Sequence, residues 1–279
     1  MFASACAPPW ASARYLDLSA RLLLLFLATD DADAGDLVEP PADRPWAIGR
    51  FAPSLARWAD EFTELSAAPG DRARFVDAFH GYVRARKAEA APGAQALTPE
   101  EHARLRRQTI FLDPLVIAGC VASGLDLGRL GRHVGACCDD AAHAIWLAND
   151  LGSYDRDRAE GEAGDLNIIA ADLRASGGPE ARAFDRVVER YNGLVRALRA
   201  RFEALAGDPA AGADGARFAE LLGAIVDGNL VAMGALGSRY SRLDALRGRL
   251  ASALGPASAA PLAQSAAAAS AVESEAEPK

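Results

Sequence analysis

The chain has 279 residues, of which 51% are hydrophobic and 24% charged, enough for a globular domain with a sizeable core. Its net charge is −8 and it has no long basic run, which argues against nucleic acid as a partner and, less strongly, against anionic membrane surfaces. The four cysteines lack CxxC spacing and the four histidines form no zinc-type pair. We therefore expect free thiols and a cytoplasmic location.

An apolar run near the start, Leu22–Ala28, is followed by Ala32-Asp33-Ala34 and resembles a signal-peptide core with a cleavage site. The preceding segment is long and contains Asp17, and the run is too short to span a bilayer. The main prediction is a buried helix without stable membrane insertion, and secretion is the minor alternative.

Nearly every segment predicts helix, because Ala and Leu dominate, β-branched residues are sparse and no alternating pattern is sustained. The first predicted helix runs from near Trp10 to about Asp30. The second carries Phe51 to Phe62 and the third Phe75 to Tyr82, each at helical spacing.

A fourth helix begins at the Thr98-Pro99 cap and runs to a break near Asp113-Pro114. The remaining predicted helices cover Leu115–Ala122, Leu127 to the stretch at Asn149, Ile168–Leu173, Glu180–Leu205, Ala216–Gly237 and Tyr240–Leu254. The sequence thus predicts a single all-α domain over residues 1–254. An Ala/Ser/Pro-rich tail over residues 255–279 is expected to be disordered.

The stretch ANDLGSYDRDRAE places Asn149, Ser153 and Asp157 at i, i+4 and i+8, on one helix face. All three offer hard oxygen atoms of the kind that Mg²⁺ prefers, and Arg156 lies beside them for a phosphate oxygen. The alternative is a solvated polar stripe. Against it, the apolar run from Ala144 leads directly into the stripe, which favours a polar face that lines a cavity.

A second oxygen-rich group, Asp30, Asp31 and Asp33, follows the first predicted helix. Carboxylates this close repel each other unless cations neutralise them, and acids at a helix C-terminus oppose the macrodipole. Bound cations explain the cluster better than the alternative, an exposed helix end with a polar loop.

Arginines complete the pattern. Arg106 or Arg107 in RLRRQTI, and the pair Arg239-Tyr240, could hold a diphosphate that Mg²⁺ bridges, although each is also compatible with an ordinary surface position. Because metal ions and arginines would neutralise the charge on the leaving group, this chemistry would need no protein nucleophile. The sequence accordingly has no GxSxG, P-loop or other recognisable nucleophile motif.

These motifs resemble those of class I terpene synthases, most closely the bacterial terpene cyclases. ANDLGSYDRDRAE is similar to the family's "NSE" metal motif, with Asp157 where Glu is commoner and Glu160 as a fallback ligand. Gly164-Asp165-Leu166-Asn167 resembles a stretch just downstream. The Asp30 cluster resembles the Asp-rich motif with shortened DDxD spacing.

The diphosphate-sensor region of the family resembles LRRQTIFLDP. Arg106 is the match and Arg107 the alternative. The resemblance places Thr109-Ile110-Phe111 near the helix break of this region, although the stretch lacks the usual Gly. Arg239-Tyr240 matches the family's RY pair. The chain begins close to the acidic motif, so we expect the N-terminal helices of the family to be short or missing.

The resemblance implies a single-domain isoprenoid synthase bundle around a central apolar pocket, and Mg²⁺-dependent cyclisation of farnesyl or geranylgeranyl diphosphate to a terpene hydrocarbon or alcohol. It also implies three Mg²⁺ ions and a homodimer. The alternatives are a non-catalytic prenyl-diphosphate-binding protein and a chain-elongating prenyltransferase. Four aromatic residues could line the pocket, although plain core packing is the more common role of aromatics at helical spacing: Phe26, Phe79, Phe111 and Trp146.

Overall fold

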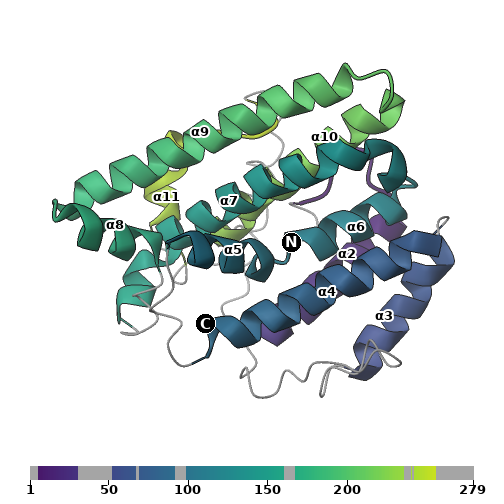
Figure 1. Cartoon of the computed structure of the whole chain (residues 1–279), viewed down its shortest axis with the longest axis horizontal. Coiled ribbons are helices and arrows are strands. Elements are labelled where there is room, and N and C mark those ends of the chain that lie inside the picture. The colour runs from purple at the N-terminus through teal and green to yellow at the C-terminus, as the bar shows by residue number, and fades with distance from the viewer. Residues whose placement is uncertain are drawn as a thin grey trace, which may run out of the picture. The chain divides into compact units, whose positions relative to one another are not determined.

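The computed structural model describes residues 6–30, 52–66, 69–91, 99–159, 167–235, 240 and 242–255. The α-helices, labelled in Figure 1, are α2 (Ala13–Asp30), α3 (Ala52–Leu65), α4 (Pro69–Glu89), α5 (Pro99–Thr109), α6 (Leu112–Ala122), α7 (Leu127–Ala159), α8 (Ile168–Ser176), α9 (Glu180–Ala206), α10 (Gly212–Ala235) and α11 (Leu243–Leu246). The 3₁₀ turn η6 (Arg247–Arg249) follows α11. These described ranges contain no strand, which confirms the predicted all-α class.

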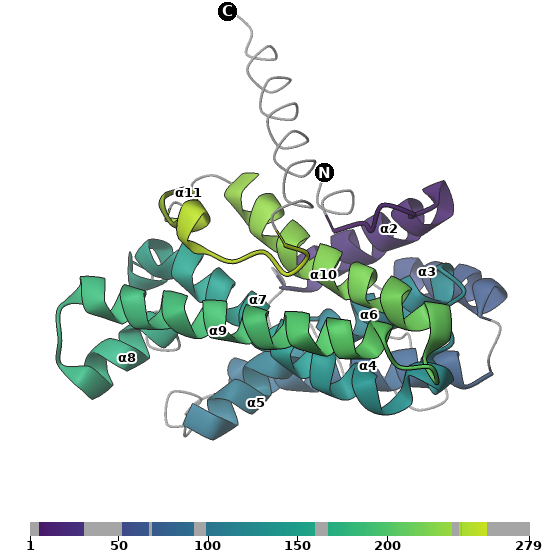
Figure 2. The ribbon, with the colours of Figure 1, turned by 90° about the horizontal axis from the view of Figure 1, so that it is seen from above.

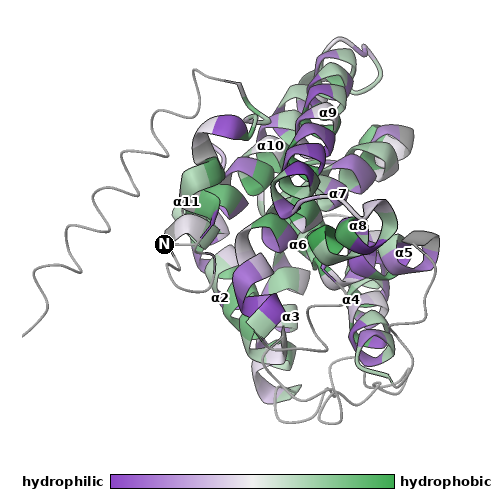
Figure 3. Cartoon of the chain, turned by 90° about the vertical axis from the view of Figure 1, so that its left-hand side faces the viewer, coloured by the Kyte–Doolittle hydropathy of each residue, from purple (hydrophilic) through white to green (hydrophobic). Residues whose placement is uncertain are grey.

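The contacts divide the chain into two compact units. The α4 unit comprises Pro9–Cys138 and Leu205–Leu221, and the α9 unit comprises Met1–Pro8, Asp139–Ala204 and Leu222–Lys279. Helices α7 and α10 contribute to both units. Most of the helices carry hydrophilic and hydrophobic residues together, as Figure 3 shows, so each has apolar positions to bury.

An aromatic cluster forms the core of the α4 unit. Trp58 and Phe62, one turn apart on α3, are stacked with ring centroids 5.1 Å apart, and Phe75 of α4 lies 4.7 Å from Trp58. The indole N–H of Trp58 donates to the Leu18 carbonyl of α2 at 3.0 Å. The apolar spacing read from the sequence therefore marks the buried face of α3.

The break between α5 and α6 falls at Ile110–Phe111, within the stretch where the family resemblance expects it and slightly before the break predicted near Asp113-Pro114. Pro114 stands in the first turn of α6, where its missing N–H breaks no helical bond. Phe111 adopts φ 61°, a left-handed conformation that L-residues rarely take. Its ring is fully buried and stacks on Phe26 with centroids 4.7 Å apart, so packing offsets the backbone cost.

In the α9 unit, α8 folds back beside the first turns of α9 (Figures 1 and 2). Asn167 caps α8 by accepting the Ile169 N–H at 2.9 Å, and Gly177, with φ 62°, ends it. Asp172 of α8 accepts from Arg186 of α9 at 3.0 Å. A cap, a glycine stop and an ion pair thus define this helical hairpin.

The last predicted helix, Tyr240–Leu254, is confirmed only in part. Its described residues form the short α11 and η6, and the chain then runs without helix from Leu250 to Gly255. Side chains of neighbouring helices take over its backbone groups. Asn192 of α9 donates to the Arg249 carbonyl and accepts the Ala251 N–H.

Buried Asp227 of α10 completes that replacement. Its carboxylate accepts the Ala253 N–H at 2.6 Å, the Leu254 N–H at 3.0 Å and the Ser252 hydroxyl at 2.7 Å. Burial raises the pKa of Asp227 although these three bonds oppose the shift. The predicted tail begins at Gly255, which still bonds to Ser252, and its residues 256–279 lie outside the described part of the chain.

Candidate active site

The three predicted metal ligands of α7 lie together on one face in the α9 unit. Buried Ser153 donates its hydroxyl to Asp157 Oδ2 at 2.6 Å. Asn149, two turns before Asp157, accepts from Asn229 of α10 at 3.2 Å. The stripe is therefore buried or part-buried among other polar groups and is not a solvated surface. That it lines a cavity stays a prediction.

Asp157 already has a cation beside it. Arg156 donates to Asp157 Oδ1 at 2.7 Å, and Asn167 donates to Asp157 Oδ2 at 2.9 Å. Both carboxylate oxygens are thus bonded, one of them to a guanidinium. Arg156, predicted to meet a phosphate oxygen, here neutralises the carboxylate.

Asn167 also fixes the end of the stripe to the body of α7. Its amide donates to the Asp150 carbonyl at 2.9 Å, while the Asp150 carboxylate accepts the Ile168 N–H at 2.9 Å and the Trp146 indole N–H at 2.8 Å. Asp150 is 4% exposed, so these bonds replace its lost solvation. The sequence showed Asn167 only as part of a family-like stretch, and it gave no sign of the role of Asp150.

The C-terminal segment packs on the same helix. A Cβ built on Gly152 would lie 2.3 Å from Leu243 Cδ1 and 3.0 Å from Tyr240 Cδ1. The glycine between Asn149 and Ser153 therefore lets Tyr240, a predicted diphosphate ligand, pack against α7. Arg239, the other half of that pair, lies outside the described residues, as does Glu160.

The acidic cluster belongs to the α4 unit. Asp30 is the last residue of α2, and Asp31 and Asp33 lie outside the described residues. Just before Asp30, the Thr29 hydroxyl lies 3.2 Å from the Tyr82 hydroxyl of α4. This contact fixes the acidic end of α2 along α4.

The two candidate sensor arginines have different partners. Arg106 donates to Glu89 at 2.8 Å, and Arg107 forms a two-pronged pair with Asp113 at 3.0 and 2.8 Å. Burial would raise the pKa of Glu89, but the charges and hydrogen bonds of Arg106 and Arg86 hold it below its ordinary value. Glu89 was not found from the sequence, where it is one of many acids.

Three of the predicted aromatics belong to the packed core of the α4 unit. Phe79 and Phe111 meet edge to face with centroids 5.7 Å apart, and Phe26 packs against Phe111. Trp146, in the α9 unit, is 2% exposed. These four aromatic side chains therefore pack in the core, which is the more common role of aromatics at helical spacing.

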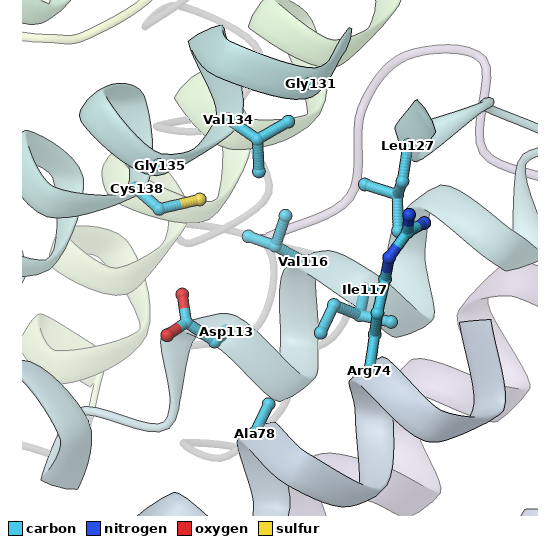
Figure 4. Close-up of a pocket in the computed structure, with 10 residues that line it drawn as sticks. All are labelled: Arg74, Ala78, Asp113, Val116, Ile117, Leu127, Gly131, Val134, Gly135 and Cys138. Carbon is cyan, nitrogen blue, oxygen red and sulfur yellow. The ribbon is translucent and has the colours of Figure 1, made fainter. Parts of the chain in front are cut away.

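A cavity of about 360 Å³ lies in the α4 unit between residues of α4, α6 and α7, shown in Figure 4. Val116, Asp113 and Cys138 line it, and none of the four predicted pocket aromatics does. Burial raises the pKa of the Cys138 thiol, which keeps it protonated and poorly nucleophilic.

The oxygen set of α7 fits a hard cation. Ser153 Oγ and Asp157 Oδ2 converge to 2.6 Å, close to the roughly 2.9 Å that separates neighbouring oxygens around Mg²⁺. One carboxylate among neutral donors suits a metal that also binds phosphate. Over the described part of the chain, no group of three or more His, Cys, Asp or Glu residues could hold a metal.

A family profile described as "Terpene synthase family 2, C-terminal metal binding" matches residues 24–197. This range includes the acidic cluster, the two candidate sensor arginines and the stripe of Asn149, Ser153 and Asp157. A search of curated proteins found no match. None of the described helices combines the length and the apolar character that a membrane span requires.

Solved structures share the fold. The chain is similar to 2-methylisoborneol synthase from Streptomyces coelicolor A3(2), solved with Mg²⁺ and 2-fluorogeranyl diphosphate, at 21% identity and TM-score 0.71, covering 86% of this chain and 83% of that one. It is also similar to linalool/nerolidol synthase from Streptomyces clavuligerus, solved with 2-fluorogeranyl diphosphate, at 21% identity and TM-score 0.66, covering 83% and 87%. A single-substitution variant of cucumene synthase matches at 18% identity and TM-score 0.66, covering 86% of each chain.

Proposed function

This chain belongs to the terpene synthase family whose C-terminal metal-binding profile it matches, and from that premise we propose that it is a Mg²⁺-dependent terpene cyclase. Its substrate is a linear isoprenyl diphosphate, farnesyl or geranylgeranyl diphosphate, and its product is a cyclic terpene hydrocarbon or alcohol. The observation that carries the proposal is the enclosed stripe of Asn149, Ser153 and Asp157, with Tyr240 packed beside it.

The proposed metal ligands of the α9 unit are Asn149, Ser153 and Asp157, and those of the α4 unit are Asp30, Asp31 and Asp33. Three bound Mg²⁺ ions would neutralise the negative charge that develops on the diphosphate as it leaves. Because Arg156 now bonds to Asp157, metal binding there would release its guanidinium for a phosphate oxygen.

The remaining proposed contacts are made by Arg106, Arg239 and Tyr240, which would add hydrogen bonds to the diphosphate. The allylic cation that remains must be kept from water, which would quench it. We propose that apolar residues of the helices surround the hydrocarbon during cyclisation. A homodimer and a cytoplasmic location remain predictions.

The test is incubation of the full chain with Mg²⁺ and, separately, geranyl, farnesyl and geranylgeranyl diphosphate, followed by gas chromatography–mass spectrometry of hexane extracts. We expect a cyclic product from one substrate, lost in Ser153→Ala and kept in Asp139→Asn, which removes an exposed charge from the same helix. A parallel incubation that also contains isopentenyl diphosphate, treated with phosphatase before extraction, tests for elongation, and a longer prenyl alcohol there would instead identify a chain-elongating enzyme. Mg²⁺-dependent ligand binding without any product would identify a binding protein.

A further inference from the structure

Arg106 and Arg107 are neighbours in α5, yet their guanidinium groups are held by carboxylates of different helices. Arg106 bonds to Glu89, the last residue of α4, and Arg107 bonds to Asp113 in the first turn of α6. Successive residues of a helix point about 100° apart. Different partners therefore hold the two groups in different places within the α4 unit.

The partner of Arg106 lies on the face of α4 that contacts the end of α2. Tyr82, Arg86 and Glu89 stand at i, i+4 and i+7, on one face of α4. Tyr82 meets Thr29, the residue before Asp30, and Glu89 is about 10 Å further along α4. Glu89 therefore lies on the same face of α4 as the residue that contacts the end of α2.

The partner of Arg107 has a different setting. Asp113 lines the cavity of Figure 4, whose walls come from α4, α6 and α7 and include Val116 and Cys138. The Arg107–Asp113 pair therefore belongs to the side of α6 that meets α7.

Glu89 is held from both sides. Its two oxygens accept from Arg86 at 2.7 Å and from Arg106 at 2.8 Å, and its side chain is only 9% exposed. Because the carboxyl is ionised, two guanidinium groups and one carboxylate leave a net charge of +1 in a mostly buried cluster. Such a cluster attracts an anion while its geometry stays fixed.

We propose that the Arg86–Glu89 pair positions Arg106 as the diphosphate-binding arginine of this chain, and that Arg107 has a structural role with Asp113. A guanidinium has five N–H donors, and the Glu89 bond uses one, so binding of Glu89 does not exclude a diphosphate. The inference rests on the proposed function and adds Glu89 and Arg86 to its machinery as positioning residues.

The test measures the Kd for inorganic diphosphate in the presence of Mg²⁺ by isothermal titration calorimetry on the full chain. Glu89→Gln is compared with Asp113→Asn, because each removes one negative charge from beside one of the two arginines. We expect about tenfold weaker binding in Glu89→Gln and less than about twofold change in Asp113→Asn. With the accepted prenyl diphosphate, KM should rise in Glu89→Gln only.

The direction of the change in diphosphate affinity distinguishes a positioning role of Glu89 from a simple effect of its charge. If charge alone mattered, both variants would bind diphosphate more tightly, and that result would overturn the proposal. Weaker binding in Asp113→Asn alone would do the same by assigning the role to Arg107. If the unmodified protein binds no diphosphate, the proposed function fails together with this inference.

A second pair covers the case in which Glu89→Gln does not fold. Arg86→Gln keeps the Glu89–Arg106 bond but removes its second anchor, while Lys87→Gln removes the same charge from the exposed side of the same turn. We expect severalfold weaker diphosphate binding in Arg86→Gln and none of that loss in Lys87→Gln. Equal binding in the two variants would reject the positioning role.

Discussion

Gly152 is the residue on which the packing of the C-terminal segment against α7 depends. It lies between two of the proposed metal ligands, and the side chains of Leu243 and Tyr240 occupy the space that a Cβ would need. Gly131, in the same helix, has a different role. Its φ of 32° and ψ of −107° mark a kink, with nothing within 4 Å of a Cβ. Gly152 is thus needed for close packing, and Gly131 for its backbone conformation.

Gly152→Ala should therefore lower the free energy of unfolding by about 1–3 kcal/mol, because Leu243 and Tyr240 must shift. Gly135→Ala, in the same helix and with open space around its Cβ, should be neutral or stabilising by up to about 1 kcal/mol. Urea titration of both variants measures this. Equal stability of the two would show that the segment does not press on α7.

Glu89 predicts a pH dependence of stability. Its pKa is lowered in the folded protein, so the unfolded chain binds more protons between the two pKa values. The stabilisation is complete above the ordinary value of about 4.3 and is lost as pH falls through the lower folded value. Burial and the charge of Arg106 also lower the pKa of nearby His102. This group therefore also makes the folded protein less stable as the pH falls.

The prediction is that the unfolding free energy of the unmodified protein falls more steeply below about pH 4.5 than that of Glu89→Gln. Denaturant titrations at pH 3.5, 4.5 and 6 on both proteins give the two slopes. Parallel slopes would mean that Glu89 titrates normally in the folded protein.

At the scale of elements, α7 has two faces that make different polar contacts. One carries the proposed metal ligands, and the other carries Asp155, which pairs with Arg242 at 2.6 Å. Arg242 also pairs with Glu180 of α9 at 2.9 Å and lies 4.5 Å from the centre of the Phe184 ring. A single side chain thus ties the segment of Tyr240 to both α7 and α9.

Arg242→Ala should loosen that segment. We expect faster amide hydrogen exchange over residues 243–246 and a loss of about 1–2 kcal/mol, because ion pairs and ring contacts of a part-buried arginine are lost together. Arg249→Ala is the matched control, since its partner Asp185 is 62% exposed and should contribute little. Exchange rates unchanged in Arg242→Ala would contradict this view of the segment.

For the whole molecule, the proposed function predicts a stability that depends on two ligands together. Mg²⁺ with inorganic diphosphate should raise the Tm, because a ligand at about 100 times its Kd stabilises the folded state by about 2.7 kcal/mol. Mg²⁺ alone or diphosphate alone should change the Tm little, because the positive charge of the metal and the negative charge of the diphosphate must neutralise each other in the site. Differential scanning fluorimetry, with EDTA as the control, measures both. An equal shift with diphosphate alone would exclude the bridging metal.

The helices and the stripe of Asn149, Ser153 and Asp157 could be predicted from the sequence. Helical periodicity is a local property, and spacing along a helix fixes which side chains share a face. Most of the acidic cluster, Arg239 and the tail beyond Gly255 lie outside the described residues and stay predictions. The order of the motifs along the chain was also enough for the family resemblance, which the family profile confirms.

Tertiary structure alone decided the rest. The family resemblance placed a helix break near Phe111, but the left-handed conformation of that residue was not predicted, and burial of its ring stabilises this backbone conformation. Asp227 and Asn192 bind the backbone of the final segment and so replace the helical bonds that its composition predicted for the residues after η6. Glu89, 17 residues before Arg106, distinguishes it from Arg107. In each case the deciding partner is distant in sequence, and only packing brings such partners within the reach of a hydrogen bond or a ring contact.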